Sequence, residues 1–336
     1  MPDSVTQDFN NHLDAVIMWV DGADPELAKK RNFFLNEIKS IGSHGTTATF
    51  FASNNEIKYC VLSILKFAPY FRHIFIVTDG QDPEIYNDVE VMFPGRAESI
   101  KIVDHKEIFR GYEQYLPVFN STSILSMIWR IKGLSEHFVC FSDDVFIIRD
   151  LKPEDWFING KPVLRGRWLL PPYRKMASSF LKTFFNKYIK GNKAFKPRLS
   201  FYMRQRNAAL LLGIKNRYFF HCHTPHPLNR KTIEDFFKKN QNLLEKNISN
   251  RFRSPDQLIL TSLAYHLEIK AGNRTFEKLN LGYLHPIYSK QKLQRKIRNC
   301  RENPEIKFVC AQNLDLFYVK EREGIFSWLD EILVNK

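Results

Sequence analysis

Two adjacent carboxylates, Asp143 and Asp144, interrupt an otherwise apolar stretch that runs from His137 to Asp150. The apolar residues on both sides predict one buried strand with the pair in its middle. Because burying an unpaired charge is costly, the pair indicates a metal, a cationic ligand or a strand end that opens into a cleft. A surface turn between two short strands is the alternative, since Asp pairs are common there. We expect the buried, functional pair.

The chain of 336 residues is 44% hydrophobic and contains 29 Phe, a composition that excludes disorder. No apolar run approaches the ~20 residues that span a bilayer, and the polar, acidic N-terminus resembles neither a signal peptide nor a transit peptide. The five cysteines form no C-x-x-C pair, so neither a disulfide framework nor a zinc ribbon is expected. We therefore expect a cytoplasmic protein, free or peripheral at the inner face of the plasma membrane.

A basic segment lies between Trp156 and Ile233, where seventeen Lys and Arg occur without any Asp or Glu. These seventeen positive charges exceed the net charge of the whole chain, which is +14, so the rest of the chain carries a small net negative charge. We expect the segment to face phosphates, an anionic polymer or a membrane surface. Its predicted helix from Tyr173 to Lys190 has an apolar face flanked by lysines. Packing of that face on the core is our first expectation, and an anionic lipid surface or an acidic glycan is the alternative.

Strands and helices alternate in the first part of the chain, which predicts a doubly wound α/β fold with a mostly parallel sheet. Predicted strands run from Asp14 to Val20, from His73 to Thr78 and from Ser99 to His105, with a helix from Ser53 to Phe71 between the first two. Asp21 follows the first strand at the carboxyl edge of the sheet, where ligands bind in such folds. An ordinary Asx turn is an equal alternative for this residue.

We interpret residues 1–336 as one catalytic domain in which residues of about 160–205 form an inserted basic helical lobe. A helix is expected from Phe119 to His137, leading into the stretch with the acidic pair. After the lobe, His221, His223 and His226 end a strand-like run, and Arg251 and Arg253 precede another helix. A further strand ends at Asn313 and Asp315, and an amphipathic helix starts near Gly324.

These residue types suit the transfer of a phosphoryl-linked group. Carboxylates hold Mg²⁺ or Mn²⁺, which neutralises a diphosphate. Arginine binds phosphoryl oxygens bidentately, and histidine can take a proton from an attacking hydroxyl. The chain contains neither GxxxxGK[ST] nor GxGxxG, so a P-loop NTPase or a dinucleotide enzyme is not supported. A nucleotide-sugar donor held through a metal-bound diphosphate fits better.

Several motifs then occur in one order: WVDGADP, NNEIKYCVLSILKFAPYFRHIFIVTDGQDP, GLSEHFVCFSDDVF, HTPHPL with RFRSPDQ, and KFVCAQNLD. Together they resemble the four conserved regions of the Stealth family, from Asp14 to about Leu316. These are bacterial capsular polysaccharide phosphotransferases, similar to the catalytic region of the animal GlcNAc-1-phosphotransferase. The resemblance implies a GT-A-like fold. It also implies transfer of a hexose-1-phosphate, such as N-acetylhexosamine-1-phosphate, from a UDP-sugar to an acceptor hydroxyl, with UMP leaving.

The resemblance also implies roles for individual residues. Asp143 and Asp144 match the acidic pair that serves the metal, Mg²⁺ or Mn²⁺. His223 matches the candidate base and Arg253 the arginine that contacts the phosphate. Substrate-binding positions are expected at the following residues: Asp21, Asn54, Glu56, His226 and Arg251. The implied partners are a UDP-sugar and an anionic capsular polysaccharide, with contact to the membrane or the capsule machinery and none to nucleic acid.

The chain departs from the family pattern at three places. Leu125 stands where the family usually has Glu, and Leu62 stands where it often has Arg. Asn313 lies near the position of the family's final Asn-Asp, with Asp315 beyond. These departures favour a divergent subgroup with another donor. Two alternatives to a sugar-1-phosphate transferase remain: a metal-dependent GT-A glycosyltransferase that releases UDP, and a non-enzymatic binder of nucleic acid or anionic lipid.

Overall fold

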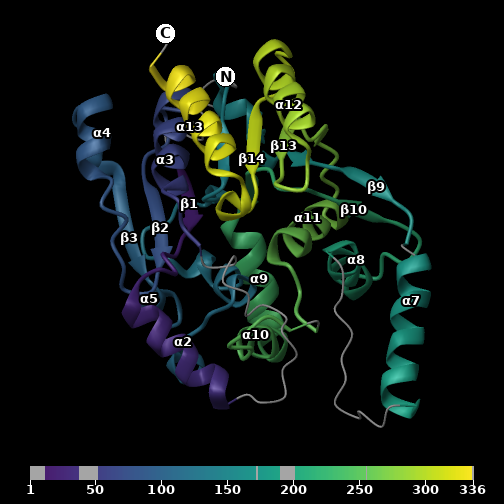
Figure 1. Ribbon diagram of the computed structural model, residues 1–336. Helices are drawn as coiled ribbons and strands as arrows, with labels where there is room; N and C mark the ends of the chain where they lie inside the picture. Colours follow the sequence, from purple (N-terminus) through teal and green to yellow (C-terminus); the bar gives the residue numbers. More distant parts are fainter. Residues whose placement is uncertain (1–11, 38–51, 172, 190–200, 255, 335–336) are drawn as a thin grey trace, which may run out of the picture.

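The computed structural model describes residues 12–37, 52–171, 173–189, 201–254 and 256–334. The polar N-terminus and the middle of the expected basic lobe lie outside these ranges. At the centre is a sheet with the strand order β11-β4-β1-β2-β3, of which Figure 1 labels β1, β2 and β3. Its strands are β1 (Leu13–Met18), β2 (Ile74–Thr78), β3 (Ile100–Asp104), β4 (His137–Ser142) and β11 (His226–Asn229). Only β11 runs antiparallel to its neighbour.

The strand order reverses at β1, which pairs with β2 on one side and with β4 on the other. The chain passes from β1 to β2 through α2 (Pro25–Glu37) and α3 (Glu56–Phe67), and from β2 to β3 through α4 (Tyr86–Met92). It then returns to β4 through α5 (His105–Ile108) and α6 (Ser121–Leu125). In open sheets of this kind, ligands bind at the carboxyl ends of the strands beside such a reversal.

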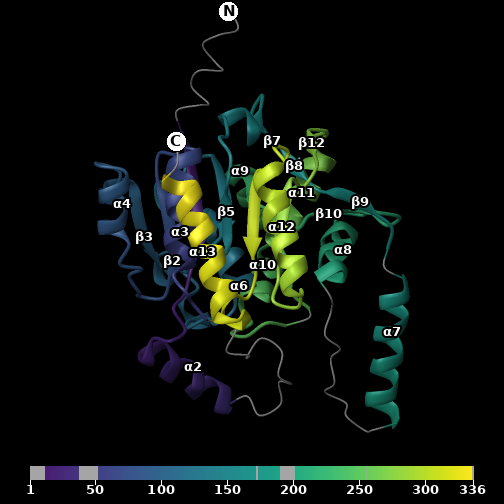
Figure 2. The same cartoon turned by 45° about the horizontal axis from the view of Figure 1, so that its top comes forward.

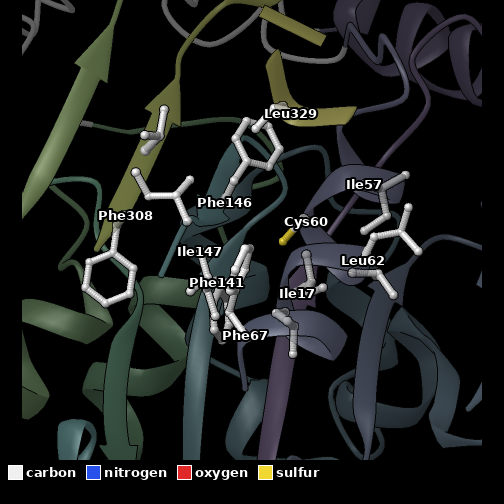
Figure 3. Close-up of a cluster of buried hydrophobic side chains, with 14 of the residues drawn as sticks. Ile17, Ile57, Cys60, Leu62, Phe67, Phe141, Phe146, Ile147, Phe308 and Leu329 are labelled. Atoms are coloured by element: carbon white, nitrogen blue, oxygen red, sulfur yellow. The ribbon is translucent and has the colours of Figure 1, made fainter. Parts of the chain in front are cut away.

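The strands bury both faces of the sheet, because alternate residues enter two different cores. Ile17 of β1 and Phe141 of β4 lie in one core cluster (Figure 3). Residues of α3, α12 (Lys290–Glu302) and α13 (Val319–Val334) belong to the same core. Val16 and Cys140, the sequence neighbours of Ile17 and Phe141, belong to the opposite core. That core is closed by α5, α6, α9 (Arg230–Lys239), α10 (Gln241–Ile248) and α11 (Leu260–Lys270). The predicted doubly wound α/β class with a mostly parallel sheet is confirmed.

A second sheet has the order β13-β14-β5 and consists of β5 (Val145–Ile147), β13 (Leu281–Leu284) and β14 (Phe308–Ala311). The prediction of one buried strand from His137 to Asp150 was therefore wrong. The strand β4 ends at Ser142, Asp143 and Asp144 form a turn, and β5 continues into the second sheet. The turn is nevertheless a strand end, because it lies at the carboxyl edge of β4.

The helix expected from Phe119 to His137 is also shorter than predicted. Only α6 and a 3-10 turn at Ile128–Arg130 are helical there. The remaining strands form three two-stranded sheets. They are β6 (Phe157–Ile158) with β7 (Lys161–Pro162), β8 (Leu164–Arg165) with β12 (Phe276–Glu277), and β9 (Arg167–Leu169) with β10 (Tyr218–Phe220). Among the described residues, no helix is long and apolar enough to cross a membrane.

Between β9 and β10 the chain forms α7 (Tyr173–Phe184), a short π-helical turn at Phe185–Ile189, and α8 (Phe201–Leu211). The helix α7 stands away from the rest of the molecule in both ribbon views (Figures 1 and 2). Its apolar residues are exposed, for example Phe180 at 70% and Leu181 at 64%. Our first expectation, that this face packs on the core, was therefore wrong.

Candidate active site

A pocket of about 390 Å³ opens at the reversal between β1 and β4. Residues that follow both strands line it, including Trp19 after β1 and the turn residues Asp143 and Asp144 after β4. Other parts of its wall come from α6, α8 and the segments around residues 221–226, 253 and 312–315. The pocket thus draws together segments that are far apart in the sequence.

One wall of the pocket is acidic. Burial raises the pKa of the Asp143 carboxyl well above its usual value, and the charges of Asp144 and Glu56 raise it further. Burial also raises the pKa values of Asp144 and Glu56. At Asp144 the electrostatic influence of the nearby His223 ring and a hydrogen bond from the Cys310 Sγ, at 3.6 Å, oppose this rise in pKa. The three carboxylates therefore lie in a site that favours a cation.

This acidic wall suits a Mg²⁺ or Mn²⁺ ion only as part of a complex with substrate. Among the described residues, no group of three or more His, Cys, Asp or Glu side chains is placed to hold a metal ion. Mg²⁺ commonly uses one or two carboxylates and completes its shell with water and substrate phosphates. Asp143 and Asp144 fit that mode, because a bound cation would relieve the mutual repulsion that raises the pKa of Asp143.

His223 lies between two aromatic rings at the pocket wall. Its ring stacks on Phe201 with a centroid distance of 5.6 Å and on Tyr283 at 5.8 Å. Among the described residues it makes no hydrogen bond, so stacking alone fixes the ring plane and the ring nitrogens can meet a substrate. His223 acts electrostatically on Asp144, whose pKa it lowers, and both residues line the same pocket.

The two flanking histidines, His221 and His226, are of a different kind. Both are buried, and burial lowers the pKa of His221 to about 3 and that of His226 well below its usual value. His221 Nε2 is 3.1 Å from Thr261 Oγ1, and His226 Nδ1 is 3.3 Å from Tyr265 Oη. Both line the pocket, but as neutral groups with protein partners.

Arg253 lies on a loop that buried amides hold in place. Asn120 Nδ2 donates to the carbonyl oxygens of Asn250, at 2.9 Å, and Phe252, at 3.1 Å. The same nitrogen lies 2.8 Å from Gln257 Oε1. Arg253 in turn donates from Nη2 to Ser121 Oγ at 3.0 Å. These hydrogen bonds fasten the loop to the start of α6, and the guanidinium group of Arg253 lines the pocket.

Arg204 of α8 reaches the same place from another direction. Its Nη2 donates to Thr122 Oγ1 at 2.7 Å, one residue after the contact of Arg253. Burial and the charge of Arg253 lower the pKa of Arg204 to about 10. Its Nε is buried without a hydrogen-bond partner, and no carboxylate in the described part of the chain pairs with it. Two guanidinium groups therefore meet at the start of α6, in the pocket that Asp143 and Asp144 also line.

Reasoning from sequence did not single out Arg204. It is one of seventeen cations in the acid-free segment, and no local motif distinguishes it from the others. The structure also brings Asn313 and Asp315 to the pocket wall, together with Leu125. Leu62, by contrast, is 1% exposed and lies on the side of α3 that packs in the core.

Three of the expected substrate-binding residues lie outside the pocket lining. Asp21 accepts a hydrogen bond from the Ala23 N–H at 2.9 Å, the contact of an Asx turn. The Asn54 side chain accepts from Arg322 at 2.9 Å. Arg251 donates to the carbonyl oxygens of Pro117 at 2.9 Å and Leu116 at 3.1 Å. In this structure, these side chains fasten loops around the site, whereas Glu56 and His226 line it.

The pocket therefore combines buried carboxylates, a pair of arginines and a stacked histidine. It lies where the strand order of the sheet reverses in an α/β protein. The Stealth protein CR2 profile, conserved region 2, matches residues 50–163. The receptor polysaccharide phosphotransferase WefC of Streptococcus oralis is 28% identical over 82% of this chain and 83% of its own length. The capsular polysaccharide phosphotransferase eps5J of Streptococcus thermophilus is 34% identical over 52% of this chain and 68% of its own.

Among solved structures, the chain is similar to the galactosyltransferase LgtC in complex with donor and acceptor sugar analogs. The TM-score is 0.46 at 10% identity, over 96% of this chain and 97% of that one. On the sequence relatives, this chain belongs to the Stealth family of polysaccharide phosphotransferases and is a transferase. The resemblance found from its motifs is confirmed.

Proposed function

We propose that the protein transfers a hexose-1-phosphate, specifically an N-acetylhexosamine-1-phosphate, from a UDP-sugar to an acceptor sugar hydroxyl. The product is a phosphodiester-linked capsular polysaccharide, and UMP leaves. The observation that carries this proposal is that one pocket is lined both by the carboxylates Asp143 and Asp144 and by the guanidinium groups of Arg204 and Arg253. Membership of the family supports the same reaction class.

In the proposed reaction, the acceptor oxygen bonds to the phosphorus that carries the sugar, and the bond from this phosphorus to the UMP oxygen breaks. His223 takes the proton of the acceptor hydroxyl, since no described residue occupies its ring nitrogens. Arg253 and Arg204 hold the phosphoryl oxygens of the transferred group and stabilise the charge that develops there. Asp143 and Asp144 would hold a divalent metal, which would supply positive charge against the donor diphosphate.

The acceptor in this proposal is an anionic capsular polymer. The acid-free segment from Trp156 to Ile233 supplies cations beside the pocket through α8, and a polymer with phosphodiester links would carry the complementary charge. We place the reaction in the cytoplasm, at the inner face of the plasma membrane, where the polymer would be extended.

The released nucleotide tests the proposal. The purified protein is incubated with a panel of UDP-sugars, Mg²⁺ and an acceptor oligosaccharide, and the nucleotide product is identified. UMP together with an acceptor that gains a sugar phosphate is the expected result. UDP together with an acceptor that gains only a sugar would show glycosyl transfer and overturn the phosphotransfer proposal.

A further inference from the structure

The helix α7 carries a continuous apolar surface that the rest of the described chain leaves exposed. Five apolar side chains of α7 and of the π-helical turn after it are 49% to 76% exposed: Phe180, Leu181, Phe184, Tyr188 and Ile189. The spacing of Phe180, Leu181, Phe184 and Tyr188 puts them on one side of a helix. Phe184 and Tyr188 are in ring contact, at 5.2 Å between centroids. Both ribbon views show the helix apart from the body (Figures 1 and 2).

The charge around this surface is of one sign. The helix and the turn after it fall within the segment that has seventeen Lys and Arg and no acidic residue. Lys182 is exposed on α7, and its spacing in the sequence turns it away from the apolar side. A surface of this kind requires a partner that offers hydrocarbon to the apolar side and negative charge to the flanks.

We infer that α7 lies flat on an anionic phospholipid bilayer, with Phe180, Leu181 and Tyr188 at the acyl boundary. The helix has 12 residues, or about 18 Å, which is too short to span a bilayer but suits an interfacial position. Aromatic rings favour the headgroup level, and phosphate headgroups match the lysines. This inference concerns attachment, so it stands independently of the donor and the nucleotide released.

Two other occupants fit the surface less well. A second copy of the chain would bring two acid-free segments together, and the like charges would repel. A polysaccharide would stack on the aromatic rings, but Leu181 and Ile189 offer it neither a flat ring nor a hydrogen-bonding group. Only a bilayer interface uses the aliphatic residues, the aromatic residues and the positive charge together.

Vesicle binding by the full-length chain tests the inference. The wild type is sedimented with vesicles of phosphatidylcholine containing phosphatidylglycerol, and with pure phosphatidylcholine vesicles. The test variant carries Phe180→Ser, Leu181→Ser and Tyr188→Ser. The control variant carries Val91→Ser, Tyr318→Ser and Val334→Ser, which are 74%, 81% and 73% exposed on other elements. We expect the wild type and the control to bind anionic vesicles, and the test variant to bind about tenfold more weakly or worse.

The transfer rate on a soluble acceptor should be equal in all three proteins, which shows that the test variant is folded. Weak binding to pure phosphatidylcholine, and loss of binding at high salt, are also expected because the attraction is partly electrostatic. Equal vesicle binding by the test variant and the wild type would overturn the inference. The inference would also be overturned if the wild type did not bind vesicles and the test variant instead lost self-association or required a longer polysaccharide acceptor.

Discussion

At the scale of single residues, ring stacking positions His223, which makes no hydrogen bond within the part of the chain that the structure describes. The rings of Phe201 and Tyr283 lie on it at 5.6 and 5.8 Å. This arrangement fixes the plane of the imidazole and leaves its nitrogens for a substrate. An imidazole held in this way can be replaced without breaking a hydrogen bond among the described residues.

Replacing His223 by Ala should lower the turnover number by about 10²- to 10⁴-fold, because proton transfer from the acceptor is lost. The donor dissociation constant and the circular dichroism spectrum should change little. Steady-state kinetics and donor titration measure both quantities. His285→Ala is the matched control, since His285 lies outside the pocket lining but also contacts Tyr283, at 5.9 Å. Normal turnover in His223→Ala would remove this residue as the base.

Arg204→Gln should lower the transfer rate by about 10²- to 10³-fold, as expected for loss of one preorganised donor to a developing charge. Arg204→Lys should recover only part of that loss, because an ammonium group lacks the planar fork of the guanidinium. Arg217→Gln is the control within the same basic segment. Its guanidinium lies over the Trp168 ring at 4.2 Å, outside the pocket lining. Equal rates for Arg204→Gln and Arg217→Gln would refute a role in phosphate binding.

At the scale of elements, close packing of β13 between α12 and β14 fixes the second sheet. A Cβ on Gly282 of β13 would collide with Cys300 Sγ of α12 and would press on Val309 of β14 at 3.2 Å. The strand β14 also pairs with β5, the strand that follows the acidic turn. The position of Asp143 and Asp144 therefore depends on how closely these layers pack.

Gly282→Ala should lower the free energy of unfolding by about 1–3 kcal/mol, because the added methyl forces α12 away from the strand. Gly324→Ala in α13 is the matched control. A Cβ there meets nothing within 4 Å, so the helix should gain about 0.5–1 kcal/mol. Urea unfolding of the two variants measures the difference. A neutral effect of Gly282→Ala would mean that the layers relax freely.

Sequence patterns predicted several elements well and failed at others for identifiable reasons. The strands β1, β2 and β3 were found because short apolar runs end at turn-forming residues. The stretch around Asp143 was predicted as one strand because both halves are apolar. Periodicity cannot reveal that β4 and β5 pair with different sheets, since pairing depends on β1 and β14.

At the scale of the whole molecule, buried neutral histidines make stability depend on pH. Burial lowers the pKa of His221 to about 3, against an ordinary value of 6.5. Between these values the unfolded chain binds the proton and the folded chain does not. This contribution to stability is therefore present above the unfolded pKa and is lost as the pH falls below it.

The free energy of unfolding should fall by about 1.4 kcal/mol for His221 when the pH is lowered to about one unit below 6.5. His221→Gln should remove this part of the pH dependence, because glutamine does not titrate. Urea unfolding of both proteins at neutral and mildly acidic pH provides the comparison. Identical pH profiles for the wild type and the variant would show that His221 is already protonated, or titrates normally, in the folded state.

The sequence by itself determined the parallel core, the presence of an acidic pair within an apolar stretch and the family of the chain. All three are properties of local runs of residues, and local runs are visible without a fold. Only the tertiary structure decided that Arg204 and Arg253 converge on Ser121 and Thr122, because such contacts depend on where distant segments pack. It also decided that the apolar face of α7 is exposed, since an amphipathic stripe looks the same whether a core or a membrane covers it.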